Sequence, residues 1–247
     1  MSPHALLSDG RMPLICVPLV ARTRVELLAD AALVVSQKPD VIEWRADYFD
    51  DIESGDLVVS AGLALREITG KIPLIFTLRS SAEGGNPVSL STQAMNALQL
   101  ALTDQLPFEF HDIEMRQPTT LIHDLVRKVH ARRGKTILSA HDFQGTPDND
   151  ALESLFLRAH QLGADVAKIA VMPQSPDNVL RLLAVTRRVS QMLPIPIISM
   201  SMGSLGVMSR IFGGVFGSAL TFASGAGSSA PGQLPIEDLR AMLNRLG

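Results

Sequence analysis

The 247-residue sequence predicts a single-domain α/β protein, and within that class a (β/α)8 barrel (TIM barrel). Three observations lead to this fold. Short apolar runs alternate with longer segments of helical periodicity, which is the pattern of a parallel sheet covered by helices. The chain has about the usual length of a (β/α)8 barrel, roughly 250 residues. No linker or low-complexity stretch divides it, so residues 1–247 are interpreted as one domain.

Eight apolar runs of strand length are expected to form the barrel. They are LICVPLV (14–20), VIEWR (41–45), PLIFTLR (73–79), FEFHDIE (108–114), TILSAH (136–141), VAKIAV (166–171), IPIISMSM (195–202) and ALTFA (219–223). Prolines that fit the first turn of an intervening helix are Pro118, Pro176 and Pro235. Glycines that fit helix ends are Gly70, Gly134, Gly163 and Gly217.

An open, doubly wound sheet is the main alternative fold. It would favour a glycine-rich phosphate-binding turn after the first strand. The segment LVARTRVELL follows that strand and contains no glycine, which weakens a dinucleotide-binding interpretation. A glycine-rich stretch, SGAGSSAPG (224–232), follows the last strand without the Rossmann spacing. We interpret it as a mobile loop over the barrel mouth, with a plain flexible connection as the alternative.

Composition argues for an ordinary globular protein. The net charge of −3 gives no sign of a nucleic-acid surface. The single cysteine, Cys16, lies in an apolar run and is expected to be a buried, inert thiol. No basic region precedes an apolar segment at the start, and no run approaches the roughly 20 apolar residues of a membrane span. We expect a cytoplasmic protein that contacts neither membrane nor nucleic acid, with residues 1–12 as an extension or a cap on the barrel bottom.

Polar side chains recur on one face of five consecutive predicted strands, close to their carboxyl ends. They are Glu43 and Arg45, Thr77 and Arg79, Asp112 and Glu114, Ser139 and His141, and Lys168. Side chains alternate between the two faces of a strand, so in a barrel these would point inward while the apolar face lies under the helices. The carboxyl-terminal mouth of a barrel is where active sites lie. Solvated strand-end charges are the alternative, which repeated charge on strands covered on both sides disfavours.

Lys168 is the most informative of these residues. It is flanked by valine, alanine and isoleucine, and a buried ammonium without compensation is costly. Close to guanidinium groups and apolar walls, we expect a neutral amine that attacks a ketone and forms an imine. His141 on the preceding strand is placed to move protons, and Asp112 is expected to hold its ring. The arginines suit a substrate with a carboxylate and hydroxyl groups, and the six histidines show no metal-ligand spacing.

With these residues in place, the chain resembles the type I 3-dehydroquinate dehydratases of the shikimate pathway. The matching stretches are IEWRAD (42–47), FTLRSSAEGG (76–85), DIE (112–114), SAHDF (139–143), AKIAVMPQS (167–175), ISMSMGSLGVMSR (198–210), VFGSALTF (215–222) and SSAPGQLP (228–235). They run in family order from near residue 40 almost to the end of the chain. Together they are specific, although SMG or APGQ alone would mean little.

The resemblance implies a reaction and an assembly. The enzyme would be a hydro-lyase of aromatic amino acid biosynthesis that dehydrates 3-dehydroquinate to 3-dehydroshikimate through a lysine Schiff base, without a cofactor or metal, as a homodimer. Lys168 matches the imine-forming lysine and His141 the general acid/base. Glu83 matches a supporting carboxylate, and Asp112 one that orients the histidine. The positions that match substrate contacts are Glu43, Arg45, Arg79 and Arg210, with Ser229 and Gln233 from the closing loop. The positions that match apolar walls are Met200, Met202 and Phe222.

Three positions depart from the family pattern. Pro18 stands where members often carry a serine, Ala140 where an asparagine is common, and the loop SGAGSS where lysines occur in a well-known form. Two other functions remain open. A class I aldolase is one, because GSLG and GAGSSAPG occupy the loops where barrels often bind phosphate, although Arg45 and Arg79 suit a carboxylate elsewhere. A binding protein that lost its chemistry is the other, and the presence of both Lys168 and His141 argues against it.

Overall fold

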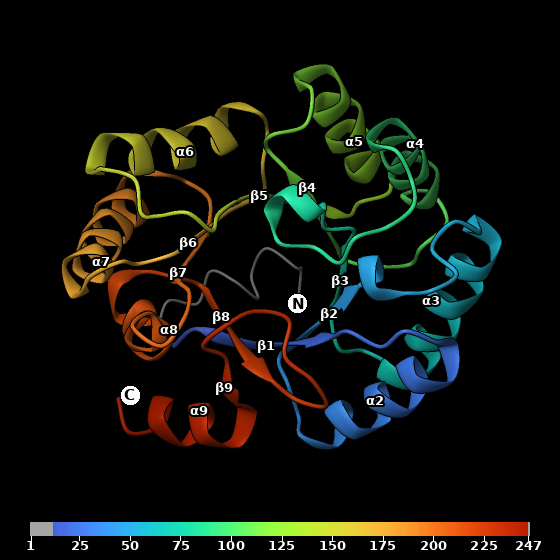
Figure 1. Ribbon diagram of the computed structural model, residues 1–247, viewed down its shortest axis with the longest axis horizontal. Helices are drawn as coiled ribbons and strands as arrows, with labels where there is room; N and C mark the ends of the chain where they lie inside the picture. The colour runs from blue at the N-terminus through green and yellow to red at the C-terminus, as the bar shows by residue number, and fades with distance from the viewer. Residues whose placement is uncertain (1–11, 247) are drawn as a thin grey trace.

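The computed structural model describes residues 12–246, and its strands form a ring enclosed by helices (Figure 1). The strands are β1 (Leu14–Leu19), β2 (Val41–Arg45), β3 (Leu74–Thr77), β4 (Phe110–Glu114), β5 (Lys135–Asp142), β6 (Val166–Val171), β7 (Ile197–Ser201), β8 (Leu220–Ser224) and β9 (Leu234–Pro235). The helices are α2 (Arg24–Ser36), α3 (Gly55–Thr69), α4 (Thr92–Leu102), α5 (Thr119–Ala131), α6 (Asn149–Gln161), α7 (Pro176–Met192), α8 (Val207–Phe212) and α9 (Ile236–Leu243). All but Met12 of the predicted extension or cap at 1–12 lies outside the described residues.

The strands pair in parallel in the order β7-β6-β5-β4-β3-β2-β1-β8-β9. A bridge between Ile197 and Ser218 joins β7 to the start of β8, and the Ala219 amide donates to the Ile197 carbonyl at 2.8 Å. The ring therefore closes, as a barrel requires and an open doubly wound sheet does not. The eight predicted strands and the fold class are confirmed. The sequence did not predict β9, a two-residue strand beside β8.

Helix ends follow from local side-chain chemistry. Thr23 caps α2 in a capping box, since its hydroxyl accepts from the Glu26 amide and the Glu26 carboxylate accepts from the Thr23 amide. Pro176 occupies the first turn of α7, as predicted. Pro118 and Pro235 instead stand one residue before α5 and α9, at the N-cap position. Proline suits both places because neither requires an N–H for a helical bond.

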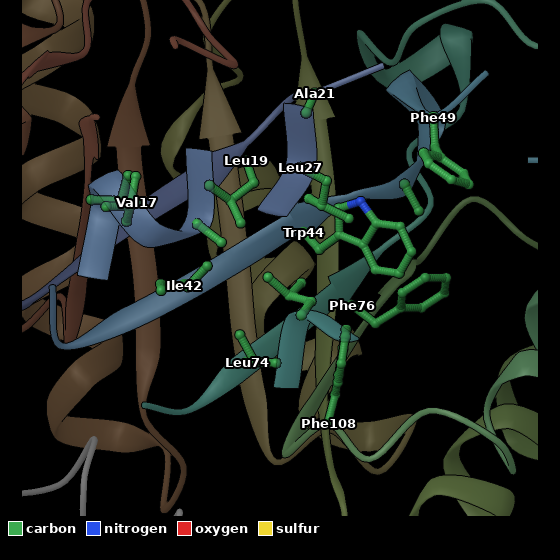
Figure 2. Close-up of a cluster of buried hydrophobic side chains, with 14 of the residues drawn as sticks. Val17, Leu19, Ala21, Leu27, Ile42, Trp44, Phe49, Leu74, Phe76 and Phe108 are labelled. Atoms are coloured by element: carbon green, nitrogen blue, oxygen red, sulfur yellow. The ribbon is translucent and has the colours of Figure 1, made fainter. Parts of the chain in front are cut away.

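Apolar and polar residues separate onto the two faces of each strand. Outside the barrel, the Trp44 ring packs in T-shaped pairs with Phe49 and Phe76, with ring centroids 5.8 Å and 6.0 Å away (Figure 2). Inside, Val41 joins a buried floor formed by Cys16, Ile75, Phe110, Ile137 and Val166. Closer to the carboxyl ends of the strands, the same inward faces carry polar residues, such as Glu43 and Arg45 on β2. These residues form a polar layer above the floor. The alternation that predicted an inward polar face is confirmed, and so is the burial of the Cys16 thiol.

His111 points outward from β4 and is 3% exposed, with its ring against Phe76 and its Nδ1 atom without a hydrogen-bond partner. Burial, with a smaller contribution from the Arg132 charge, lowers the pKa of His111 to about 4. The unfolded chain takes up this proton near pH 6.5, so stability is lost as the pH falls from about 6.5 towards 4.

We expect the unfolding free energy of the wild type to fall by about 2 kcal/mol more between pH 7.5 and pH 5 than that of His111→Gln, because glutamine does not titrate. Urea unfolding of both proteins at the two pH values measures this difference. Equal losses in the two proteins would mean that His111 titrates alike in the folded and unfolded chain.

Candidate active site

The polar layer opens into a pocket at the carboxyl ends of the strands. The predicted site residues that line it are Glu43, Arg45, Arg79, Glu83, His141, Lys168, Ser229 and Gln233. Apolar walls come from Phe143, Ala170, Met200, Met202 and Phe222. The segment after β8 bounds the pocket through Ser229, Ala230 and Gln233. The structure thus brings together residues from five strands (β2, β5, β6, β7 and β8) and from the segments that follow β3, β5, β7 and β8, with Asp112 and Arg210 behind the lining.

Lys168 lies on β6 with its amine inside the barrel. Its Nζ atom is 2.9 Å from Asp112 Oδ2 and 3.5 Å from Glu43 Oε1. The amine also lies over the Phe222 ring, 4.8 Å from its centroid. The sequence led us to expect Glu43, His141 and the guanidinium groups of Arg45 and Arg79 near this amine, and the partners within ion-pair distance are the carboxylates of Glu43 and Asp112. An attack by this amine therefore requires that a base first take its proton.

His141 is held by Glu83. The Nδ1 atom of the ring lies 2.9 Å from Glu83 Oε2, and the backbone amide of His141 donates to the same oxygen at 3.1 Å. The prediction that Asp112 orients this ring is therefore wrong. Asp112 instead accepts from Ser139 Oγ and Lys168 Nζ. Because Glu83 Oε2 already accepts the backbone N–H, we assign the ring proton to Nδ1, which leaves Nε2 as the free base.

Burial and neighbouring charges shift the pKa values of His141 and Glu83 in opposite directions. Burial lowers the pKa of His141 well below its ordinary range, and the Arg79 and Lys168 charges add to this effect. Burial raises the pKa of Glu83 to about 8, although the Arg79 charge opposes the shift. The His141 imidazole is therefore neutral and can act as a base, while the carboxyl group of Glu83 beside it can gain or lose a proton near neutral pH.

Local backbone geometry brings Glu83 to His141. Glu83 ends a 3₁₀ turn (Ser81–Glu83) beyond β3, and the next residue, Gly84, has φ +79°. A Cβ atom on Gly84 would lie 2.2 Å from the Phe143 ring, so the chain approaches this pocket wall more closely than another residue allows.

Arg79 connects the carboxylates of the site. Its guanidinium lies 2.8 Å from Asp112 Oδ1, 3.2 Å from Glu114 Oε1 and 3.6 Å from Glu83 Oε2. Burial alone raises the pKa of Asp112, but the Arg79 and Lys168 charges outweigh it and hold that pKa well below its usual range. Asp112 therefore stays ionised between two cations. Glu114 was on a predicted polar face but was not named as a site residue.

Arg210, on α8, is buried behind the pocket wall. Its guanidinium donates to the Pro231 carbonyl at 3.0 Å and lies 3.8 Å from Met200 Sδ. Within residues 12–246, no carboxylate lies within ion-pair distance of it, and its Nε atom has no hydrogen-bond partner. Burial lowers the pKa of Arg210 to about 10. A buried guanidinium without a counterion is suited to an anionic group brought by a ligand.

Comparison with known proteins identifies the family. The sequence profile of the family described as "Type I 3-dehydroquinase" matches residues 15–247. A 3-dehydroquinate dehydratase from Albidiferax ferrireducens is 48% identical over 240 residues, which cover 97% of this chain and 91% of the relative. The chain belongs to the type I 3-dehydroquinases. As a member of this family it is an enzyme of the hydro-lyase class, so the binding-protein and aldolase alternatives are set aside.

Solved structures of the family share this barrel. The 3-dehydroquinate dehydratase of Geobacillus kaustophilus superposes with a TM-score of 0.92 at 40% identity, covering 95% of this chain and 91% of that one. The type I enzyme of Clostridium difficile, whose structure holds covalently modified comenic acid, gives a TM-score of 0.90 at 37% identity, covering 95% and 92%.

The described residues contain neither a metal-binding cluster nor a membrane-spanning helix. No group of three or more histidine, cysteine, aspartate or glutamate side chains between residues 12 and 246 is arranged to hold a metal ion. Over the same range, no helix combines the length and apolar character that crossing a membrane demands.

Proposed function

We propose that this enzyme removes water from 3-dehydroquinate through an imine at Lys168, and that it works in the shikimate pathway. The observation that carries the proposal is the position of a buried lysine amine next to Asp112 and Glu43 in the same pocket as the Glu83–His141 pair. Membership of the type I 3-dehydroquinase family supports 3-dehydroquinate as the substrate. The amine supports covalent chemistry because a ketone bound above it lies within reach of a nucleophile.

The chemistry proceeds in balanced steps. His141 or a neighbouring carboxylate takes a proton from Lys168, and the amine attacks the ketone to give a carbinolamine. Loss of water gives an iminium ion, which acidifies the adjacent carbon, and a base removes a proton there to give an enamine. The enamine expels the hydroxyl group on the next carbon, and His141 supplies the proton with which it leaves as water. A second water then hydrolyses the imine, so the net change is loss of one water.

The remaining groups bind and orient the substrate. Arg45 and Arg79 present N–H donors to hydroxyl oxygens of the substrate. The Glu43 carboxylate, held by a 2.8 Å hydrogen bond from Thr77, accepts from a substrate hydroxyl group. Ser229 and Gln233 hold each other, since the Gln233 side chain accepts from the Ser229 amide at 3.0 Å and donates to its hydroxyl at 3.2 Å. This arrangement keeps the closing segment over the reacting atoms and limits access of water.

The direct test is turnover of purified 3-dehydroquinate, followed by the ultraviolet absorbance of the conjugated enone in the product. We expect absorbance to rise in proportion to enzyme concentration. Borohydride added during turnover should trap a covalent adduct on Lys168, detected by mass spectrometry of the intact protein and its peptides. Turnover without any trapped adduct would contradict the imine step. If no turnover occurs, 3-dehydroquinate is not the substrate.

Arg210 provides a prediction about substrate binding. We propose that its guanidinium pairs with the substrate carboxylate after a small rearrangement of the wall formed by Met200 and Pro231. Arg210→Lys keeps the charge but loses the planar fork, so KM should rise about 10- to 100-fold, the equivalent of a charged hydrogen bond of about 1.5–3 kcal/mol. Steady-state kinetics measure this change. An unchanged KM and kcat would show that Arg210 does not bind the substrate.

We also propose that the enzyme is a cytoplasmic homodimer, as the family resemblance implies. Light scattering on the purified protein should give about twice the chain mass of 26.6 kDa. A monomer over a wide concentration range would contradict the dimer.

A further inference from the structure

We infer that Asp47 is a positioning residue that fixes the substrate-binding arm of Arg45 and the segment carrying Glu83 in one rigid unit. This inference rests on the proposed function. Asp47 lies in a 3₁₀ turn (Ala46–Tyr48) directly after β2, and it is fully buried although it does not line the pocket. It belongs to the stretch IEWRAD (42–47), but no role for it was predicted from the sequence.

The Asp47 carboxylate accepts from four donors. Oδ1 accepts from Arg45 Nε at 2.8 Å and from the Arg79 amide at 3.4 Å. Oδ2 accepts from Arg45 Nη2 at 2.8 Å and from the Asn86 amide at 2.8 Å. The Asn86 side chain also donates to the Asp47 carbonyl at 3.1 Å. One side chain therefore joins β2, the end of β3 and the segment beyond Glu83.

The first consequence concerns Arg45. Its Nε and Nη2 atoms are both held by Asp47, which leaves Nη1 for other partners, and Nη1 lies 3.4 Å from the Ser229 carbonyl of the closing segment. A bidentate pair fixes the plane of a guanidinium as well as its position. Asp47 thus fixes the direction in which Arg45 presents its remaining donors to the substrate and to the closing segment.

The second consequence concerns Glu83. The segment from Ser80 to Asn86 leaves β3, passes through the 3₁₀ turn and returns to Asp47 at Asn86. Gly85 permits this return, because a Cβ there would lie 2.1 Å from the Arg79 carbonyl. Glu83 lies between the two points at which Asp47 bonds this stretch, the amides of Arg79 and Asn86. Asp47 therefore also holds the carboxyl group that orients His141.

An amide cannot replace this carboxylate. Both oxygens face N–H donors, so the amide nitrogen of an asparagine would meet two further donors in either orientation. Asp47→Asn preserves size and shape while breaking half of the bonds. Its effect should therefore appear as a loss of orientation in the site.

The test compares Asp47→Asn with Asp165→Asn. Asp165 is a matched control, because it also accepts several bonds, from Lys135, His130 and Thr136, but at the opposite end of the barrel, just before β6. For Asp47→Asn we expect KM for 3-dehydroquinate to rise at least about tenfold and kcat to fall, while Asp165→Asn keeps wild-type kinetics. In an Arg45→Gln background, Asp47→Asn should leave KM unchanged, because Asp47 acts on KM through Arg45. Fully additive effects on KM would overturn the inference.

A second readout needs no substrate. Hydrogen exchange of residues 83–86 should be at least about tenfold faster in Asp47→Asn and unchanged in Asp165→Asn. If the wild type does not convert 3-dehydroquinate, the proposed function fails, and this exchange still decides whether Asp47 positions the segment. If Asp47→Asn does not fold, Asn86→Ala takes its place, with faster exchange and lower kcat expected. Wild-type exchange in residues 83–86 would overturn the inference.

Discussion

Replacing Lys168 with alanine should abolish multiple-turnover catalysis, with a loss on the order of 10⁴-fold or more in kcat, as expected when a covalent nucleophile is removed. Without the amine no imine forms, and the carbon next to the ketone is then too weak an acid for His141 to deprotonate at a useful rate. Turnover of 3-dehydroquinate by enone absorbance measures the loss. Borohydride trapping should give no adduct with this variant.

The folded state of this variant needs its own check. After the amine is removed, Asp112 still pairs with Arg79, and Glu43 still accepts a hydrogen bond from Thr77. Neither carboxylate therefore loses every partner. Near-ultraviolet circular dichroism should match that of the wild type, and Lys168→Met, which refills the space, should be equally inactive. Lys135→Ala is the control, since Lys135 pairs with Asp165 outside the pocket. Near wild-type turnover in Lys168→Ala would show that the imine mechanism is wrong.

Replacing His141 with alanine should separate covalent attachment from turnover. His141 is placed to serve in the proton transfers of the proposed sequence, and one such transfer is typically worth about 10²–10⁴-fold. We therefore expect kcat to fall by at least about 10²-fold. Lys168 still has its amine in this variant, with Asp112 and Glu43 nearby to accept a proton. Borohydride should therefore trap an adduct on Lys168, accumulating more slowly than in the wild type.

The matched control for this prediction is His160→Ala, since His160 is an exposed residue near the end of α6. That variant should keep wild-type turnover and trapping. Mass spectrometry of the intact protein and its peptides, taken over time after mixing with substrate and borohydride, gives the site and the rate. Equal turnover in His141→Ala, or an adduct on any other lysine, would reverse the assignment of roles to His141 and Lys168.

The strands and their inward faces could be predicted from the sequence because both depend on neighbouring residues. Alternation along VIEWR separates Glu43 and Arg45 from Trp44, and the structure places the first two in the barrel and the third under the helices. The same reasoning put Lys168 and His141 inside. Side-chain period and apolar run length are local properties, so one sequence is enough to predict them.

Which polar groups meet inside the barrel was decided by the tertiary structure. Asp112 was the reasonable partner for His141 because β4 and β5 are neighbours, yet Glu83 occupies that place from a turn beyond β3. The path of that turn depends on Gly84, Gly85 and the bonds to Asp47. Strand periodicity carries no information about such a turn, because its direction follows from close contacts between segments that are distant in the sequence. For the same reason, the burial of Arg210 behind the pocket wall could be learned only from the folded chain.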